Sequence, residues 1–168
     1  MIETPRLRLQ PLTYDQLSKY AIADHSLEVE LKVNKTTMTI SSELKEALDN
    51  MILPNVADPD KNYLYSTLWS VIDKQQNTMV GDLCFFGEPN EKGEIEVGYG
   101  TYEEFRGKRF MIEALAGLIG WAKQQANVNT IIASTDKSNV ASYTILERNQ
   151  FTKTDETDTL FNWRLALT

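Results

Sequence analysis

The stretch that decides the fold is residues 93–123, GEIEVGYGTYEEFRGKRFMIEALAGLIGWAK. It begins with apolar residues alternating with polar or small ones, which is typical of a strand with one face on a core. A turn rich in basic residues follows at 106–109, and an apolar helix is predicted from about residue 111 to residue 124. Free backbone N–H groups and the helix dipole favour an anion at such a turn, where arginine and lysine add charge for a phosphate. The stretch therefore predicts a strand, an anion-binding turn and a buried helix.

The rest of the chain predicts a sheet around this unit. Strands are expected at 6–11, 63–72, 78–86, 94–102, 128–134, 151–155 and 160–166. Helices are expected after Thr13, at 25–33, from Ser41 or Ser42 to about residue 53, and from Ser138 or Asn139 to residue 148. Short turns join antiparallel strands, whereas a helix joins 94–102 to 128–134, so that pair should be parallel. The order predicts one α+β domain over residues 1–168, with a mixed, mostly antiparallel sheet of about six to seven strands flanked by helices.

Composition narrows the function classes. The chain of 168 residues carries a net charge of −7, which argues against nucleic-acid binding by a basic face and suits a cationic acceptor or simple solubility. Its only cysteine, Cys84, lies in an apolar run and is expected to be a packed strand residue. No Cys/His cluster suggests a metal, and no apolar run suggests a membrane span or a secretion signal, so a cytoplasmic protein is expected.

Seven short stretches of sequence occur in an order that resembles a known family. They are TPRLRLQPL at 4–12, WSVID at 69–73 with MVGD at 79–82, EVGY at 96–99, RGK at 106–108, EA at 113–114 and NVAS at 139–142. The chain thereby resembles the GNAT superfamily of N-acetyltransferases, in particular the ribosomal-protein-alanine acetyltransferase branch. The resemblance implies acetyl-CoA as co-substrate, no metal, and a primary amine as acceptor, either a protein N-terminus or a small molecule. The net charge and the lack of a long apolar run argue against a nucleic-acid or membrane partner, and a homodimer is left open.

The resemblance also implies which residues contact the cofactor. Two parallel strands would splay apart near Gly98 and Gly100 to admit the pantetheine arm, although these glycines also suit a plain β-bulge. The expected cofactor-binding residues are Val97, Gly98, Tyr99, Gly100, Thr101, Arg106, Gly107, Lys108, Arg109, Phe110, Met111, Asn139 and Ser142.

Two positions of the turn depart from the family pattern. Where the family has small residues, this chain has Arg109 and Met111, and it has Gln150 before Phe151 where glycine is usual. Arg109 could pair with a phosphate, or its bulk together with that of Met111 could close the turn. If the turn is closed, the alternative function is a non-catalytic module of the same fold.

Three residues are candidates for the acyl-transfer chemistry. By the resemblance, Ser142 would donate a proton to the leaving sulfur, and Tyr143 on the same helix is a second candidate. Glu96 could take the proton of the amine, although its alternation with apolar neighbours also suits a solvent-facing carboxylate. Asn139 could hydrogen-bond the pantetheine or could serve only as a helix N-cap.

Overall fold

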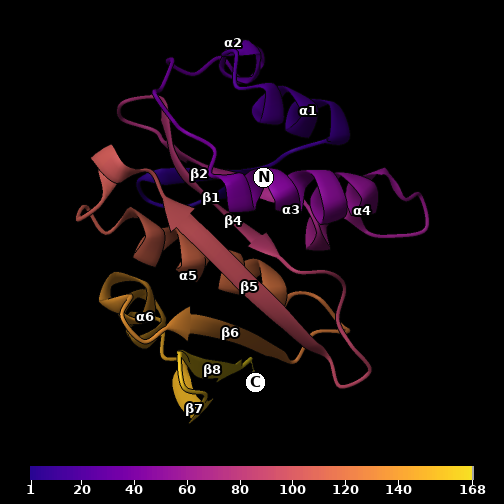
Figure 1. Cartoon of the computed structure of the whole chain (residues 1–168), viewed down its shortest axis with the longest axis vertical. Coiled ribbons are helices and arrows are strands. Elements are labelled where there is room, and N and C mark those ends of the chain that lie inside the picture. The colour runs from indigo at the N-terminus through magenta and orange to yellow at the C-terminus, as the bar shows by residue number, and fades with distance from the viewer. Residues whose placement is uncertain (168) are drawn as a thin grey trace.

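The computed structural model describes residues 1–167 and contains one eight-stranded sheet (Figure 1). Its strand order is β1-β2-β3-β4-β5-β6-β8-β7. The strands are β1 (Ile2–Glu3), β2 (Leu7–Pro11), β3 (Leu68–Asp73), β4 (Thr78–Phe85), β5 (Glu94–Thr101), β6 (Thr130–Asp136), β7 (Thr152–Glu156) and β8 (Leu160–Ala166). Among the strands of residues 1–167, only β5 and β6 pair in parallel, as expected from the helix that joins them. The mixed, mostly antiparallel sheet is confirmed.

Helices cover both faces of the sheet. They are α1 (Tyr14–Ile22), α2 (Ser26–Leu31), α3 (Ser42–Ala47), α4 (Leu53–Ala57), α5 (Phe110–Lys123) and α6 (Val140–Arg148). The larger core cluster joins α5 and α6 to one face, and the smaller cluster joins α1 to α4 to the other. Figure 1 shows α5 behind β5 and the α3–α4 segment on the other side of the sheet.

Three details differ from the sequence-based expectation. The short β1 was not predicted, because two residues are too few to show an alternating pattern. Residues 63–65 form a 3-10 turn and the strand begins only at Leu68, so the prediction of a strand from residue 63 was wrong. The helix expected at 41–53 continues through a π-helical segment, Leu48–Ile52, into α4. Pro54, the second residue of α4, carries no N–H and so removes one hydrogen bond of this continuous helix next to the π-helical segment.

No helix within residues 1–167 combines the length and the apolar composition needed to cross a bilayer. In the same residues, no three histidine, cysteine or acidic side chains gather where a metal ion could be held.

Candidate functional site

The site is organised by the point at which β5 and β6 part. The two strands pair over three positions, from Glu94 with Thr130 to Glu96 with Ile132, and beyond Glu96 they separate. A cavity of about 190 Å³ occupies the gap. It is lined by Phe86, Glu96, Val97, Gly98, Tyr99, Ala133, Ser134, Thr135 and Ser142. The splayed parallel pair is therefore confirmed, and Glu96 and Ser142 share one cavity.

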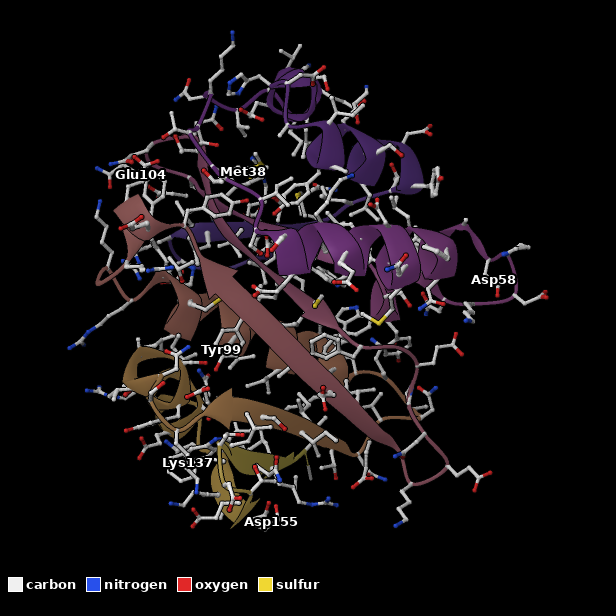
Figure 2. All side chains as sticks on the ribbon, viewed as in Figure 1. Met38, Asp58, Tyr99, Glu104, Lys137 and Asp155 are labelled. Carbon is white, nitrogen blue, oxygen red and sulfur yellow. The ribbon has the colours of Figure 1, made fainter. Side chains whose placement is uncertain are left out.

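Ser142 reaches this cavity from the first turn of α6. The side chain of Asn139 caps the helix, because its Oδ1 accepts a hydrogen bond from the Ser142 N–H at 3.1 Å. Tyr99 Oη donates to the Ser142 carbonyl at 2.8 Å, and Ser142 Oγ donates to Tyr99 Oη at 3.4 Å. Figure 2 shows Tyr99 between β5 and α6. Burial raises the pKa of Tyr99 to about 12, so the phenol stays protonated and holds α6 against β5.

Glu96 is the acid group of the cavity. It is partly buried, and this burial raises the pKa of its carboxyl above the usual value. Within residues 1–167 it forms no ion pair. A carboxylate with a raised pKa and no cationic partner can accept a proton near neutral pH.

Two residues of the turn before α5 have the left-handed backbone conformation that glycine usually adopts. Gly107 has φ +79°, and Arg109 has φ +62° although it carries a side chain. The Arg109 side chain is exposed, whereas Met111 is only 3% exposed and packs into the larger core cluster. The bulk of Met111 is therefore directed into the core and does not fill the turn.

The backbone at this turn is available to a ligand. The N–H groups of residues 107–112 donate no hydrogen bond to any other atom of residues 1–167. A cavity of about 380 Å³ lies here, between Arg106, Arg109 and the side of α6 that carries Arg148. Free N–H groups at a helix N-terminus, with arginines beside them, suit an anion such as a pyrophosphate.

Arg6 of the N-terminal segment fixes the turn from outside. Its guanidinium donates to the carbonyls of Lys108 and Arg109 at 3.1 Å and 3.2 Å. It also pairs with Glu113 of α5 at 2.8 Å and lies over the Phe110 ring, 4.9 Å from its centroid. Glu113 of the EA motif at 113–114 thus joins α5 to the start of the chain.

A third cavity of about 360 Å³ connects the other two. It shares Arg106 and Ile145 with the cavity at the turn, and Tyr99 and Ser142 with the cavity in the gap. Gly100, Thr101 and Asn139 also line it. The three cavities therefore follow one another as a groove from the start of α5 to the gap between β5 and β6.

Two of the expected site residues lie elsewhere. Tyr143 stacks on Trp163, with ring centroids 6.2 Å apart, and contacts Phe161. It lines a separate cavity of about 590 Å³ beside the β7–β8 hairpin. Lys108 lies with its Nζ 5.5 Å from the Phe105 ring centroid and lines none of the three groove cavities.

Sequence reasoning missed several residues of the groove. Ala133 to Thr135 line it because β6 is the partner strand of β5, and that role can be deduced only after the pairing is known. Phe86 and Arg148 approach from other elements, and no pattern in the sequence marks them. Arg6 belongs to the N-terminal motif 4–12, but its contact with the turn spans about a hundred residues.

Comparisons with known proteins agree with this geometry. The family model described as "Acetyltransferase (GNAT) domain" matches residues 6–152. The uncharacterized N-acetyltransferase YjdG of Bacillus subtilis (strain 168) is 30% identical over 151 residues, which is 90% of this chain and 89% of that protein.

Two solved structures illustrate the shared fold. The ribosomal L7/L12 alpha-N-protein acetyltransferase RimL in complex with coenzyme A has a TM-score of 0.68 and 16% identity, covering 97% of this chain and 95% of that one. A spermidine N-acetyltransferase SpeG chimera from Vibrio cholerae and hSSAT has a TM-score of 0.66 and 12% identity, covering 96% of both chains.

Proposed function

Because this chain belongs to the GNAT acetyltransferase family, we propose that it transfers an acetyl group from acetyl-CoA to a primary amine. The observation that carries the proposal is the groove from the start of α5 to the gap in the sheet, where Glu96 and Ser142 line one cavity. The relatives named above include enzymes of protein N-termini and of a polyamine, and the net charge of −7 suits a cationic acceptor.

The residues of the turn fit a coenzyme A pyrophosphate. The unpaired N–H groups of residues 107–112 and the exposed guanidinium of Arg109 would hold it. The edge of β5 from Val97 to Thr101 and the side-chain Nδ2 of Asn139, which donates no hydrogen bond within residues 1–167, would hold the pantetheine arm. When bound, acetyl-CoA supplies an activated thioester.

The chain's own groups then handle two protons. The neutral amine forms a C–N bond with the thioester carbonyl carbon, and the C–S bond breaks. Glu96 takes the proton that the amine loses, directly or through a water molecule. The Ser142 hydroxyl, which is hydrogen-bonded to Tyr99 Oη, gives a proton to the departing thiolate and recovers one from solvent. Tyr143 has no part in this step, because it faces the β7–β8 hairpin.

A binding measurement and a turnover measurement test the proposal separately. Acetyl-CoA should raise the melting temperature, because a ligand that binds only the native state stabilises it. Free thiol should be released when acetyl-CoA is mixed with a panel of amines and N-terminal peptides, and Ser142→Ala and Glu96→Gln should reduce the release. The absence of a thermal shift at millimolar acetyl-CoA would remove the cofactor assignment. Tight binding without turnover on the whole panel would instead identify a binding module that has lost the reaction.

A further inference from the structure

A carboxylate outside the groove lies on the same face of the sheet as Glu96. Asp82 of β4 is paired with Gly100 of β5, and Cys84 is paired with Gly98. Residues directly opposite in an antiparallel pair point to the same face, as do alternate residues of one strand. Asp82, Gly100, Gly98 and Glu96 therefore share one face, which is opposite to the face covered by α5.

One oxygen of the Asp82 carboxylate is hydrogen-bonded to the protein, and the other is not. Its Oδ2 accepts hydrogen bonds from Tyr20 Oη at 2.7 Å and from Tyr102 Oη at 3.4 Å. Its Oδ1 accepts none from residues 1–167, and no lysine, arginine or histidine of those residues forms an ion pair with it. Asp82 is partly exposed. A charged oxygen without a protein partner can accept hydrogen bonds from a ligand.

Gly100 leaves room beside this carboxylate, whereas Phe86 fills the space beside Gly98. A Cβ atom placed on Gly100 would meet no atom within 4 Å, whereas one placed on Gly98 would lie 2.7 Å from the Phe86 ring. The Phe86 side chain is 49% exposed and packs over Gly98. Figure 1 shows β5 at the front, with no helix of residues 1–167 lying across it. The free space beside Gly100 therefore lies on the same face as Glu96, next to Asp82 on the paired strand.

We propose that Asp82 is a specificity-determining residue that binds a second cationic group of the acceptor. The proposal rests on the acetyl-transfer function proposed above. Two residues of an antiparallel strand span about 7 Å, so Asp82 lies roughly 7 Å along the sheet from Gly98 and about twice that from Glu96. An acceptor can therefore place its reacting nitrogen in the cavity and a second ammonium near Asp82. This requires that its two nitrogens lie roughly 7 to 14 Å apart. Diamines and peptides with a basic second residue share this chemistry.

The test compares acceptors that differ only in the second charge. Thiol release is measured with diaminopropane, diaminopentane and diaminooctane, each against the monoamine of equal length, and with alanyl-lysine against alanyl-glutamine. The parent protein should prefer the longer diamines over their monoamines by about tenfold or more in kcat/KM, the range of a hydrogen bond to a charged group. Asp82→Asn should bring this ratio close to one, with the loss in the KM for the diamine. The peptide pair shows whether the second charge comes from a small molecule or from a peptide.

A matched variant and a binding measurement make the result decisive. Asp73→Asn removes another strand carboxylate, paired with Thr78 at the far end of β4, and should leave the ratio as in the parent. Calorimetric titration of diaminooctane should show weaker binding to Asp82→Asn than to the parent and to Asp73→Asn. Turnover without any preference for diamines, or a preference that persists in Asp82→Asn, would overturn the proposal while leaving acetyl transfer standing. Diamine binding that depends on Asp82 without any turnover would remove the acetyl-transfer function and the acceptor role of Asp82 together, and would leave Asp82 as part of a cation-binding site.

Discussion

Substitutions of Arg109 distinguish the effect of its backbone conformation on stability from the effect of its charge on ligand binding. Arg109 has φ +62° and ψ +19°, and its exposed side chain forms no hydrogen bond within residues 1–167. A left-handed conformation costs a residue with a side chain about 1–2 kcal/mol. Glycine avoids this cost but gives the unfolded chain more freedom, which costs about 0.4–1 kcal/mol. Arg109→Gly should therefore raise the free energy of unfolding by about 0.5–1 kcal/mol.

This gain can be measured by thermal unfolding without ligand. For a protein of this size, 1 kcal/mol corresponds to about 2–4 °C, so Arg109→Gly should melt about 1–4 °C higher than the parent. Arg109→Ala keeps the strain and should melt close to the parent. Lys108→Gly is the matched control, because Lys108 is not left-handed, and it should lower the melting temperature. An equal rise for alanine and glycine at residue 109 would refute the argument from backbone strain.

Coenzyme A binding to the same variants tests whether the Arg109 guanidinium pairs with a phosphate. If Arg109 pairs with a phosphate, Arg109→Ala should weaken binding by about 1–3 kcal/mol, the range for hydrogen bonds to charged groups. Arg109→Gly should lose less, because glycine permits closer approach of the backbone to the ligand. Calorimetry decides the matter, and tighter binding by Arg109→Gly than by the parent would sink the pairing model.

Three further predictions follow from the contacts of other residues. Arg6→Ala should lower the free energy of unfolding in urea by about 1–2 kcal/mol, because it removes the bonds that fasten the turn to α5, and an unchanged value would show that these exposed bonds contribute nothing. Burial raises the pKa of Asp82 from 3.8 to about 6, so the ionisation of Asp82 lowers the stability of the fold as the pH rises through that range. Asp82→Asn should therefore be more stable than the parent by about 1–3 kcal/mol at about pH 8, and should show no such gain at about pH 3. Burial likewise raises the pKa of Glu96, so kcat/KM should fall as the pH drops through that pKa, and Glu96→Gln, with lower activity throughout, should lack this dependence.

The central part of the fold was predictable because its signals are local. The alternation in β5, the length of α5 and the capping side chain of Thr13 each depend on neighbours in sequence, and the structure confirms them. The strand expected from residue 63 was wrong at its start because Asn62 caps a 3-10 turn, which competes with the extended form.

The candidate site was predictable only in part. Its groove residues on β5 and α6 follow from motifs, but the direction of a side chain depends on packing. Tyr143 and Ser142 are adjacent in sequence, yet successive residues of a helix face different sides, so one contacts Trp163 and the other lines the gap. Asp82 belongs to the MVGD motif at 79–82, but the motif gives it no place in a site, because Gly100 lies opposite it only after the strands have paired.

The narrow junction between β5 and β6 bears on how the protein unfolds. Three residue pairs join these strands, whereas seven join β6 to β8. Amide hydrogen exchange reports local opening in cooperative units. Within residues 1–167, the strand pairing that joins the unit of β6, β7 and β8 to the rest of the sheet is limited to these three pairs, and an ion pair between Arg164 and Glu94 adds to it. A ligand that fills the gap contacts both sides of it and so links the two units. Slower exchange of β8 amides on addition of coenzyme A, in a strand that does not line the groove cavities, would report this linkage directly.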